Sequence, residues 1–278
     1  MTISISDTMR SSLVALATVN TDLTVSQSRL ATGKKVNSAA DGAAVYFQAQ
    51  SMTDRAASLD KTNSQMALGL KSISAGVEAL SSMKKVMDVQ LDSMKNALTG
   101  STAQRKAAAD AFRTVLSQVN SYVNDANVLG QGNILKGAAI TFKLNEDGSS
   151  TQDIKLSSAM DAKSLGFGFD ATGKSTDASG NFATDVELNA AITKMTAALD
   201  AVNTASMSLS YQNSVVSARA DFNKSMLSVL KDGADTLTAA DVNEEAAKVG
   251  AAQTRQSFVL NGLSITRQSE QSLLQLMR

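Results

Sequence analysis

The chain has 278 residues with 26 basic and 26 acidic side chains, so its formal net charge is zero, and it contains no Cys, His, Trp or Pro. A neutral chain lacks the basic surface that nucleic acids require, and without Cys and His it lacks the usual zinc ligands and the commonest general base. No stretch approaches the ~20 apolar residues of a membrane span. We therefore expect no enzyme, metal, cofactor, nucleic acid or membrane partner, and the N-terminus does not resemble a cleavable signal peptide.

Residues 1–32 show apolar and amide side chains at alternating steps of four and three, which is the spacing of a coiled-coil helix. A short stripe of this kind is marginal in water unless another element covers it. The sequence therefore predicts a helix that needs a partner. The predicted interface positions are Met9, Leu13, Leu16, Asn20, Leu23, Gln27 and Leu30.

Residues 33–42 begin with Gly33-Lys34, a pair that also occurs in phosphate-binding loops. Such a loop needs Gly, four residues, then Gly-Lys-Ser/Thr, and it follows a strand. Here Ser28 stands at the first glycine position, Lys35 replaces the hydroxyl residue, and a predicted helix precedes the segment. We interpret residues 33–42 as a linker in which Gly33 ends one helix and the Asn, Ser and Asp that follow begin another.

Residues 43–130 continue the four-three spacing without a slip from Val45 to Leu98, which predicts a helix of roughly 80 Å at 1.5 Å per residue. Only Asn63 and Lys84 are polar in this stripe. A break at 99–101 separates it from a second predicted helix with Phe112, Val115, Val119, Tyr122, Ala126 and Leu129 in the same rhythm. The first stripe consists of Val45, Ala49, Met52, Ala56, Leu59, Asn63, Met66, Leu70, Ile73, Val77, Leu80, Lys84, Met87, Leu91, Met94 and Leu98.

Residues 131–185 are rich in glycine and turn signals. Alternating stretches at 140–144 and 154–156 flank Asn-Glu-Asp-Gly at 145–148, which predicts a hairpin. Leu165, Phe167 and Phe169 alternate as a further short strand would. We expect a small inserted β subdomain, with a loosely ordered segment at 171–180 as the alternative. The scattered Asp residues lack calcium-loop spacing, so we read them as solvated loop acids.

Residues 186–236 carry a third four-three stripe from Leu188 to Leu230, and Gly233 is expected to terminate this helix. Residues 237–278 carry a fourth stripe, interrupted by polar residues. The predicted fold is mainly α, with long antiparallel helical rods and a coiled coil built from the N- and C-terminal arms. The C-terminal interface positions are Val249, Gln253, Gln256, Leu260, Leu263, Leu274 and Met277.

Two motifs at opposite ends of the chain carry a family resemblance. The run RLATGKKVNSAADGAA at 29–44 resembles the hallmark of bacterial flagellins, usually RLSSGxRINSAADDAA. The run LTAADVNEEAA from 237, the two glutamines at 253 and 256, and the ending LLQLMR resemble the flagellin C-terminus. The departures are Gly42, where a second Asp is usual, and the aromatic residues Tyr46 and Phe47.

The resemblance implies a structural subunit that polymerises into the bacterial flagellar filament for motility. Residues 1–32 and 237–278 would form the inner coiled coil, 43–130 and 186–236 the helical rod, and 131–185 a small outer insert. Implied partners are further copies, other flagellins, hook-associated and cap proteins, and an export chaperone. The protein would leave the cell unfolded by type III export and be extracellular. A hook–filament junction protein and a cytoplasmic coiled-coil scaffold remain alternatives.

The resemblance also bears on immune recognition. Flagellins that activate the innate flagellin receptor of animals carry Arg-x-Arg-Glu on the long helix. The aligned stretch reads Val89-Gln90-Leu91-Asp92. Both cationic positions are apolar, so we expect weak or no receptor activation.

Overall fold

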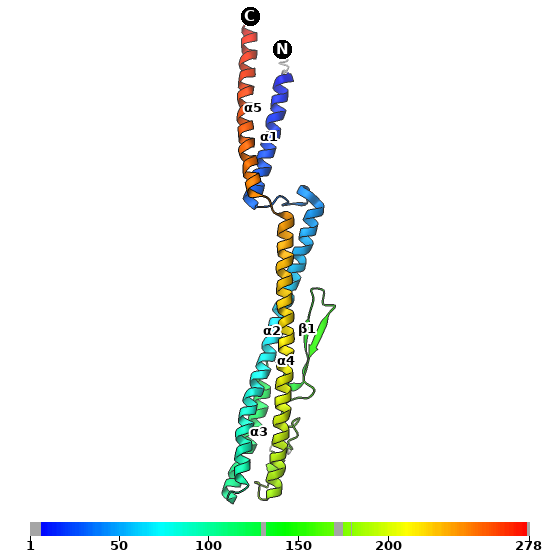
Figure 1. Cartoon of the computed structure of the whole chain (residues 1–278), viewed down its shortest axis with the longest axis vertical. Coiled ribbons are helices and arrows are strands. Elements are labelled where there is room, and N and C mark those ends of the chain that lie inside the picture. Colours follow the sequence, from blue (N-terminus) through cyan, green and yellow to red (C-terminus); the bar gives the residue numbers. More distant parts are fainter. Residues whose placement is uncertain (1–6, 129–131, 170–174, 179, 277–278) are drawn as a thin grey trace. The chain divides into compact units, whose positions relative to one another are not determined.

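The computed structural model describes residues 7–128, 132–169, 175–178 and 180–276, with the backbone only for Glu270 and residues 273–276. Long helices packing on each other and one two-stranded antiparallel sheet make up the described chain, which confirms the mainly α fold (Figure 1). The elements are α1 (Asp7–Thr32), α2 (Ala39–Ala97), α3 (Thr102–Asp125), β1 (Ile140–Lys143), β2 (Thr151–Ile154), α4 (Asp185–Thr238) and α5 (Val242–Leu276).

The chain divides into two compact units. The terminal unit comprises the described residues up to 55 and from 228 onward, and the central unit comprises those within 56–227. All the largest fully buried side chains lie in the central unit: Phe112, Phe182, Met66, Ile73, Leu80, Met83, Met87, Met94, Leu116, Ile134, Leu135 and Ile154. The domain boundaries expected from the sequence remain a prediction.

Polar side chains define where the helices begin. Asp41 accepts hydrogen bonds from the backbone N–H groups of Asn37 (3.0 Å) and Ser38 (2.9 Å), just before the helical geometry of α2 breaks at Gly42. A further hydrogen bond from the Ser38 hydroxyl is the main reason why the pKa of Asp41 lies below its usual value. Ser101 and Gln104 form a reciprocal capping box that starts α3.

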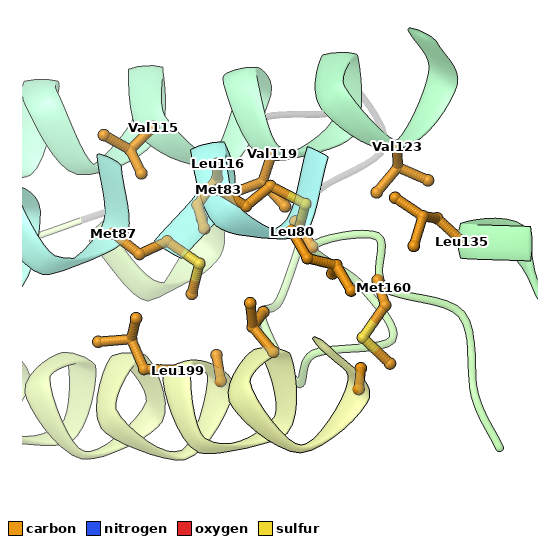
Figure 2. Close-up of a cluster of buried hydrophobic side chains, with 14 of the residues drawn as sticks. Leu80, Met83, Met87, Val115, Leu116, Val119, Val123, Leu135, Met160 and Leu199 are labelled. Atoms are coloured by element: carbon orange, nitrogen blue, oxygen red, sulfur yellow. The ribbon is translucent and has the colours of Figure 1, made fainter. Parts of the chain in front are cut away.

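The core of the central unit lies between α2, α3 and α4. Figure 2 shows Met83 of α2 beside Leu116 and Val119 of α3, while Met87 extends toward Leu199 of α4. The α2 column that contains Met66, Ile73, Leu80, Met87 and Met94 is buried, as the four-three stripe implied. The second buried column is displaced by one residue. From Gly69 onward it consists of Gly69, Gly76, Met83, Gln90 and Ala97, whereas Leu70, Val77, Lys84 and Leu98 are only half-buried. The other members of the predicted column, Ala49, Ala56, Asn63 and Leu91, are buried as predicted.

The predicted hairpin is confirmed, with β1 and β2 pairing so that Ile140 faces Ile154 and Lys143 faces Thr151. The carbonyl of Leu144, just after β1, accepts hydrogen bonds from Arg219 (3.2 and 3.1 Å) and from Asn223 Nδ2 (3.2 Å) on α4. These contacts fix the hairpin to the helix beside it.

The predicted strand at Leu165, Phe167 and Phe169 is wrong. Its backbone N–H groups bond locally, from Leu165 to Asp161 (3.0 Å) and from Phe167 to Ala162 (3.1 Å), so most of the segment is a turn. Only Phe169 makes a strand-like bridge, to Ser175. The buried ring of Phe167 instead packs edge-to-face on Phe112, with 5.6 Å between ring centroids. Of residues 171–180, for which a loosely ordered segment is the alternative prediction, 171–174 and 179 lie outside the described residues, and Thr176–Ala178 form a short 3-10 helix.

The prediction that Gly233 ends a helix is also wrong, because α4 continues to Thr238. A Cβ at Gly233 would lie 3.2 Å from Met52 Sδ. The glycine therefore allows α4 and α2 to approach closely within the terminal unit, instead of providing a cap.

Candidate assembly interface

Helices α1 and α5 lie side by side and antiparallel in the terminal unit (Figure 1). Each contributes one face in steps of three and four residues. The half-buried or buried positions of these faces are Met9, Ser12, Leu16, Val19, Leu23, Ser26 and Leu30 on α1, and Glu245, Val249, Ala252, Gln256, Val259, Leu263 and Thr266 on α5.

The predicted interface residues divide between two surfaces. Of those in the terminal helices, Met9, Leu16, Leu23, Leu30, Val249, Gln256 and Leu263 lie on the α1/α5 contact face, and Leu13, Asn20, Gln27, Gln253 and Leu260 are exposed. The Leu274 side chain and Met277 lie outside the described part of the chain. In each stripe, one set of positions faces the partner helix and the other set is exposed, although the exposed Asn20 still accepts a hydrogen bond from Gln256 on the partner helix.

The second contact column, which the sequence reading missed, contains mainly small or polar residues. Ser26 and Ala252 are buried in it, and small side chains let two helices approach closely. The sequence reading chose the neighbouring column because Leu13 and Leu260 are more apolar. A reading in steps of three and then four from Met9 would have included Val19, but nothing in the sequence distinguishes Glu245 from an exposed acid.

A cluster of charged side chains links α1 to α5 near the start of α5. Glu245 is only 4% exposed, and its Oε1 lies 3.0 Å from Lys248 Nζ and 3.6 Å from an Arg29 guanidinium nitrogen. The hydrogen bond from Lys248, with smaller contributions from Ser26 and Arg29, holds the pKa of Glu245 below its usual value. Hydrogen bonds to Glu244 and Glu245 raise the pKa of Lys248.

Backbone hydrogen bonds join the segment just after α1 to the connection between α4 and α5. Lys35 N donates to Thr238 O (2.7 Å) and Ala240 N donates to Gly33 O (2.9 Å), around an antiparallel bridge between Lys34 and Ala239. Gly33 has a φ of 69°, the left-handed conformation expected for a residue that ends a helix. Farther along the pair, Gln256 Nε2 donates to Asn20 Oδ1 (2.7 Å). These contacts fix the register of α1 against α5.

Large apolar side chains on the outer faces of this pair remain uncovered. On α5, Phe258 is 70% and Ile265 67% exposed, and Leu260 is half exposed. Leu13 and Val14 are exposed on α1. Clustered exposed apolar residues mark sites of protein–protein contact.

Neither a metal centre nor a membrane span emerges from the described part of the chain. Its His, Cys, Asp and Glu residues form no group of three or more that could hold an ion. None of its helices has an apolar stretch long enough to cross a bilayer.

Comparison with known proteins agrees with this arrangement. Residues 3–139 match the family model for the N-terminal helical region of bacterial flagellin. The chain is 25% identical to a flagellin of Brucella melitensis over 273 residues, covering 96% of this chain and 95% of that protein.

The chain belongs to the bacterial flagellin family. It is also 28% identical to flagellin FljK of Caulobacter vibrioides, over 93% of this chain and 92% of that protein. Flagellin C of Rhizobium meliloti is 23% identical over 95% of both chains. These matches extend from the N-terminal flagellin region through α5, so the family assignment covers both helices of the α1/α5 pair.

Proposed function

We propose that this chain is a structural subunit that polymerises into the bacterial flagellar filament. The observation that carries the proposal is the uncovered apolar surface of the α1/α5 pair in a chain of the flagellin family. Burial between copies would stabilise the assembly by about 25 cal/mol per Å² of apolar area. Contacts between unlike surfaces of successive copies, when they do not close into a ring, build a helical filament.

The two columns of each terminal stripe would have different roles in this assembly. We assign Met9, Leu16, Leu23, Val249 and Leu263 to the contact within one chain. Leu13, Gln253 and Leu260 would contact other copies, and Leu274 and Met277 continue the same stripe, whereas the amide of Asn20 already accepts a hydrogen bond from Gln256 within the chain. Residues 1–32 and 237–278 would thus form the inner part of the filament, 43–130 and 186–236 the rod, and 131–185 the outer insert.

A filament subunit is favoured over a hook–filament junction protein because the relatives named above are all flagellins. Each of them matches this chain along nearly the whole length of both proteins. The proposed role is structural and requires no catalysis. It implies an extracellular location, further copies and other flagellins as neighbours, and contact with hook-associated and cap proteins at the ends of a filament. Export unfolded through the type III channel, with a chaperone, suits terminal helices that gain stability by assembly.

Polymerisation of the purified chain tests the proposal, with sedimentation and negative-stain imaging as the measurements. We expect filaments from the full chain and none from a chain that lacks residues 242–278. Ordered filaments from the truncated chain would contradict the proposal.

A matched pair of substitutions locates the contact. Leu260 and Leu68 are exposed to 50% and 52%, but only Leu260 lies in the α1/α5 pair. Loss of about 1.5–3 kcal/mol of apolar burial predicts that Leu260→Ser raises the concentration needed for polymerisation roughly ten- to a hundredfold. Leu68→Ser should have a smaller effect. If the two substitutions raised the concentration needed for polymerisation equally, the assignment of this contact to the terminal helices would be wrong.

Weak or absent activation of the innate flagellin receptor is also proposed. Leu91, at a position where activating flagellins would carry a cation, is buried, and the buried Gln90 donates to the carbonyl of Ala108 (3.0 Å). This stretch therefore serves packing between α2 and α3 and offers no exposed cation. Reporter cells treated with pure protein should respond weakly, and a strong response would refute the proposal.

A further inference from the structure

Asn261 is followed by Gly262 on α5, and no other Asn of the sequence precedes a Gly. Both residues are exposed. A Cβ added at Gly262 would meet no atom within 4 Å, so packing within this chain does not require a glycine there. The Asn261 side chain makes no hydrogen bond within the described part of the chain.

The pair lies in the middle of the uncovered apolar face of α5. Phe258, Asn261, Gly262 and Ile265 are spaced at i, i+3, i+4 and i+7, which places them on one side of the helix. Phe258 and Ile265 are among the most exposed large apolar residues. A neighbouring copy that covers these two side chains would also cover the peptide bond between Asn261 and Gly262.

The helix is weak at this point in the lone chain. Beyond Ala252, no described side chain of α5 is buried. Gly262 lowers helix stability relative to Ala, because glycine loses more backbone freedom when it becomes helical. The Ser264 hydroxyl donates to the carbonyl of Asn261 (2.8 Å) and the Thr266 hydroxyl to that of Gly262 (2.9 Å), contacts that tend to destabilise a helix slightly. Local opening of α5 around Asn261 therefore requires little free energy.

Opening exposes this pair to a specific reaction. The amide nitrogen of Gly262 attacks the side-chain carbonyl carbon of Asn261, a new C–N bond forms, and the bond to the side-chain nitrogen breaks. Ammonia leaves with the amide proton, and a five-membered succinimide remains. Water then opens either carbonyl of the ring to give aspartate or isoaspartate. The closed helix prevents this attack because its backbone dihedral angles are fixed and the Gly262 N–H is directed to the carbonyl four residues earlier.

We propose that Asn261-Gly262 is a spontaneous deamidation site that converts in the unassembled chain and excludes the converted chain from assembly. The inference rests on the proposed function, because a neighbouring copy both protects the site and is repelled by the product. Either product places a carboxylate beside Phe258 and Ile265, where burial without a partner is unfavourable. Isoaspartate also adds a methylene to the main chain and interrupts the helical hydrogen bonds.

The test compares two samples of the full chain, one unassembled and one polymerised, in warm, mildly alkaline buffer. Trypsin cleaves after Arg255 and Arg267 and releases a peptide with Asn261 as its sole Asn, so mass spectrometry follows the conversion directly. We expect conversion to be roughly tenfold or more slower in filaments, the factor that about 1.4 kcal/mol of added helix stability gives. Asn63, buried in the central unit and followed by Ser, serves as an internal control that should stay unconverted.

Two variants separate the chemistry from the assembly. Asn261→Gln keeps the amide and Gly262 but disfavours the five-membered ring, so it should remain unmodified and still polymerise. Asn261→Asp should polymerise poorly from the start. When an aged wild-type sample is polymerised, converted chains should be enriched in the supernatant over the pellet.

Equal conversion in filaments and free chains, or equal amounts of converted chain in pellet and supernatant, would overturn the proposal. So would an absence of conversion in the free chain. Failure of the proposed function is distinguishable, because fresh wild-type protein would then give no sedimenting filaments while its conversion rate in solution could still be measured.

Discussion

Two glycines of α2, Gly69 and Gly76, lie one heptad apart in the central unit and let the segment before and within the hairpin pack against the helix. A Cβ at Gly69 would lie 2.5 Å from Phe142 Cε1, and one at Gly76 would lie 2.9 Å from a methyl carbon of Ile134. Phe142 and Ile134 are buried, so neither side chain can move aside freely. At the scale of single residues, the lack of a side chain at Gly69 and Gly76 thus allows the hairpin to pack closely on α2.

Gly69→Ala should destabilise the central unit. Overpacking of this kind costs about 1–3 kcal/mol, and the higher helix propensity of Ala offsets up to about 1 kcal/mol of this. Chemical denaturation measures the loss. Gly250→Ala is the matched control, since a Cβ there meets nothing within 4 Å and the change should be neutral or stabilising. A Gly69→Ala variant as stable as wild type would show that the Phe142 ring is not held in place.

Glu245 should make the α1/α5 pair sensitive to acid. Its pKa is lowered in the folded chain, so it contributes stability above its unfolded pKa and loses this contribution as the pH falls through its lower, folded value. Acid titration followed by hydrogen exchange of α5 should show protection falling below the usual glutamate range. Glu245→Gln should weaken the pair at neutral pH and flatten this dependence, while Glu244→Gln, at the more exposed neighbour, should change both less. Identical profiles for wild type and Glu245→Gln would contradict the expectation.

At the scale of elements, the helices share one departure from the sequence reading. In α1 and α5, and in α2 from Gly69 onward, one column of the predicted stripe is buried or half-buried, and the second contact column lies one residue earlier than predicted. In the central unit, α2 packs against both α3 and α4 (Figure 2). Its buried face therefore includes the fully buried Met83, whereas Val77 is only partly buried at the edge of the core. Steps of four and three fix the helix period, whereas the neighbours fix which side faces inward.

The stability effects of two substitutions should reveal this displacement. Met83→Ala should destabilise the central unit by about 2–5 kcal/mol, because Met83 is fully buried although the predicted stripe omits it. Val77→Ala, at a half-buried position that the stripe includes, should cost less. The denaturant midpoints of the two variants measure the loss of stability. A larger loss for Val77→Ala than for Met83→Ala would favour the stripe as predicted from the sequence.

The sequence predicted the helices and the hairpin because these depend on local spacing and on turn residues. The Leu165–Phe169 strand failed because alternation cannot reveal a turn that Asp161 stabilises through hydrogen bonds from Leu165 and Ser164. For the candidate interface, the four-three stripes predicted that the N- and C-terminal helices would need partners. The burial of Glu245 depends on Arg29 and Lys248, one of which lies far away in sequence, and local patterns do not contain this information.

At the scale of the whole molecule, buried apolar volume is distributed unevenly between the two units. The central unit contains every one of the largest fully buried side chains, whereas the buried residues of α1 and α5 are Ser26, Glu245 and Ala252 among those described. The terminal unit therefore has little core of its own and depends more on backbone ties and on contacts that a further copy would supply.

Thermal unfolding of the free chain should accordingly occur in two steps, with the terminal unit unfolding first. Calorimetry should resolve the transitions, and limited proteolysis should remove the terminal helices while most of residues 56–227 resists cleavage. Polymerisation should raise the first transition toward the second, because assembly stabilises only the folded state. A single cooperative transition with uniform proteolysis would contradict this expectation.

The anchored hairpin has a practical consequence. Three hydrogen bonds hold the Leu144 carbonyl to α4, while Ser150 on the other side of the turn is exposed and contributes to pairing through its backbone. The natural chain contains no cysteine, so Ser150→Cys would create a unique thiol. A maleimide dye attached there would report on growth and rotation of single fibres by light microscopy, at a point away from the α1/α5 pair in sequence and with the hairpin backbone left intact.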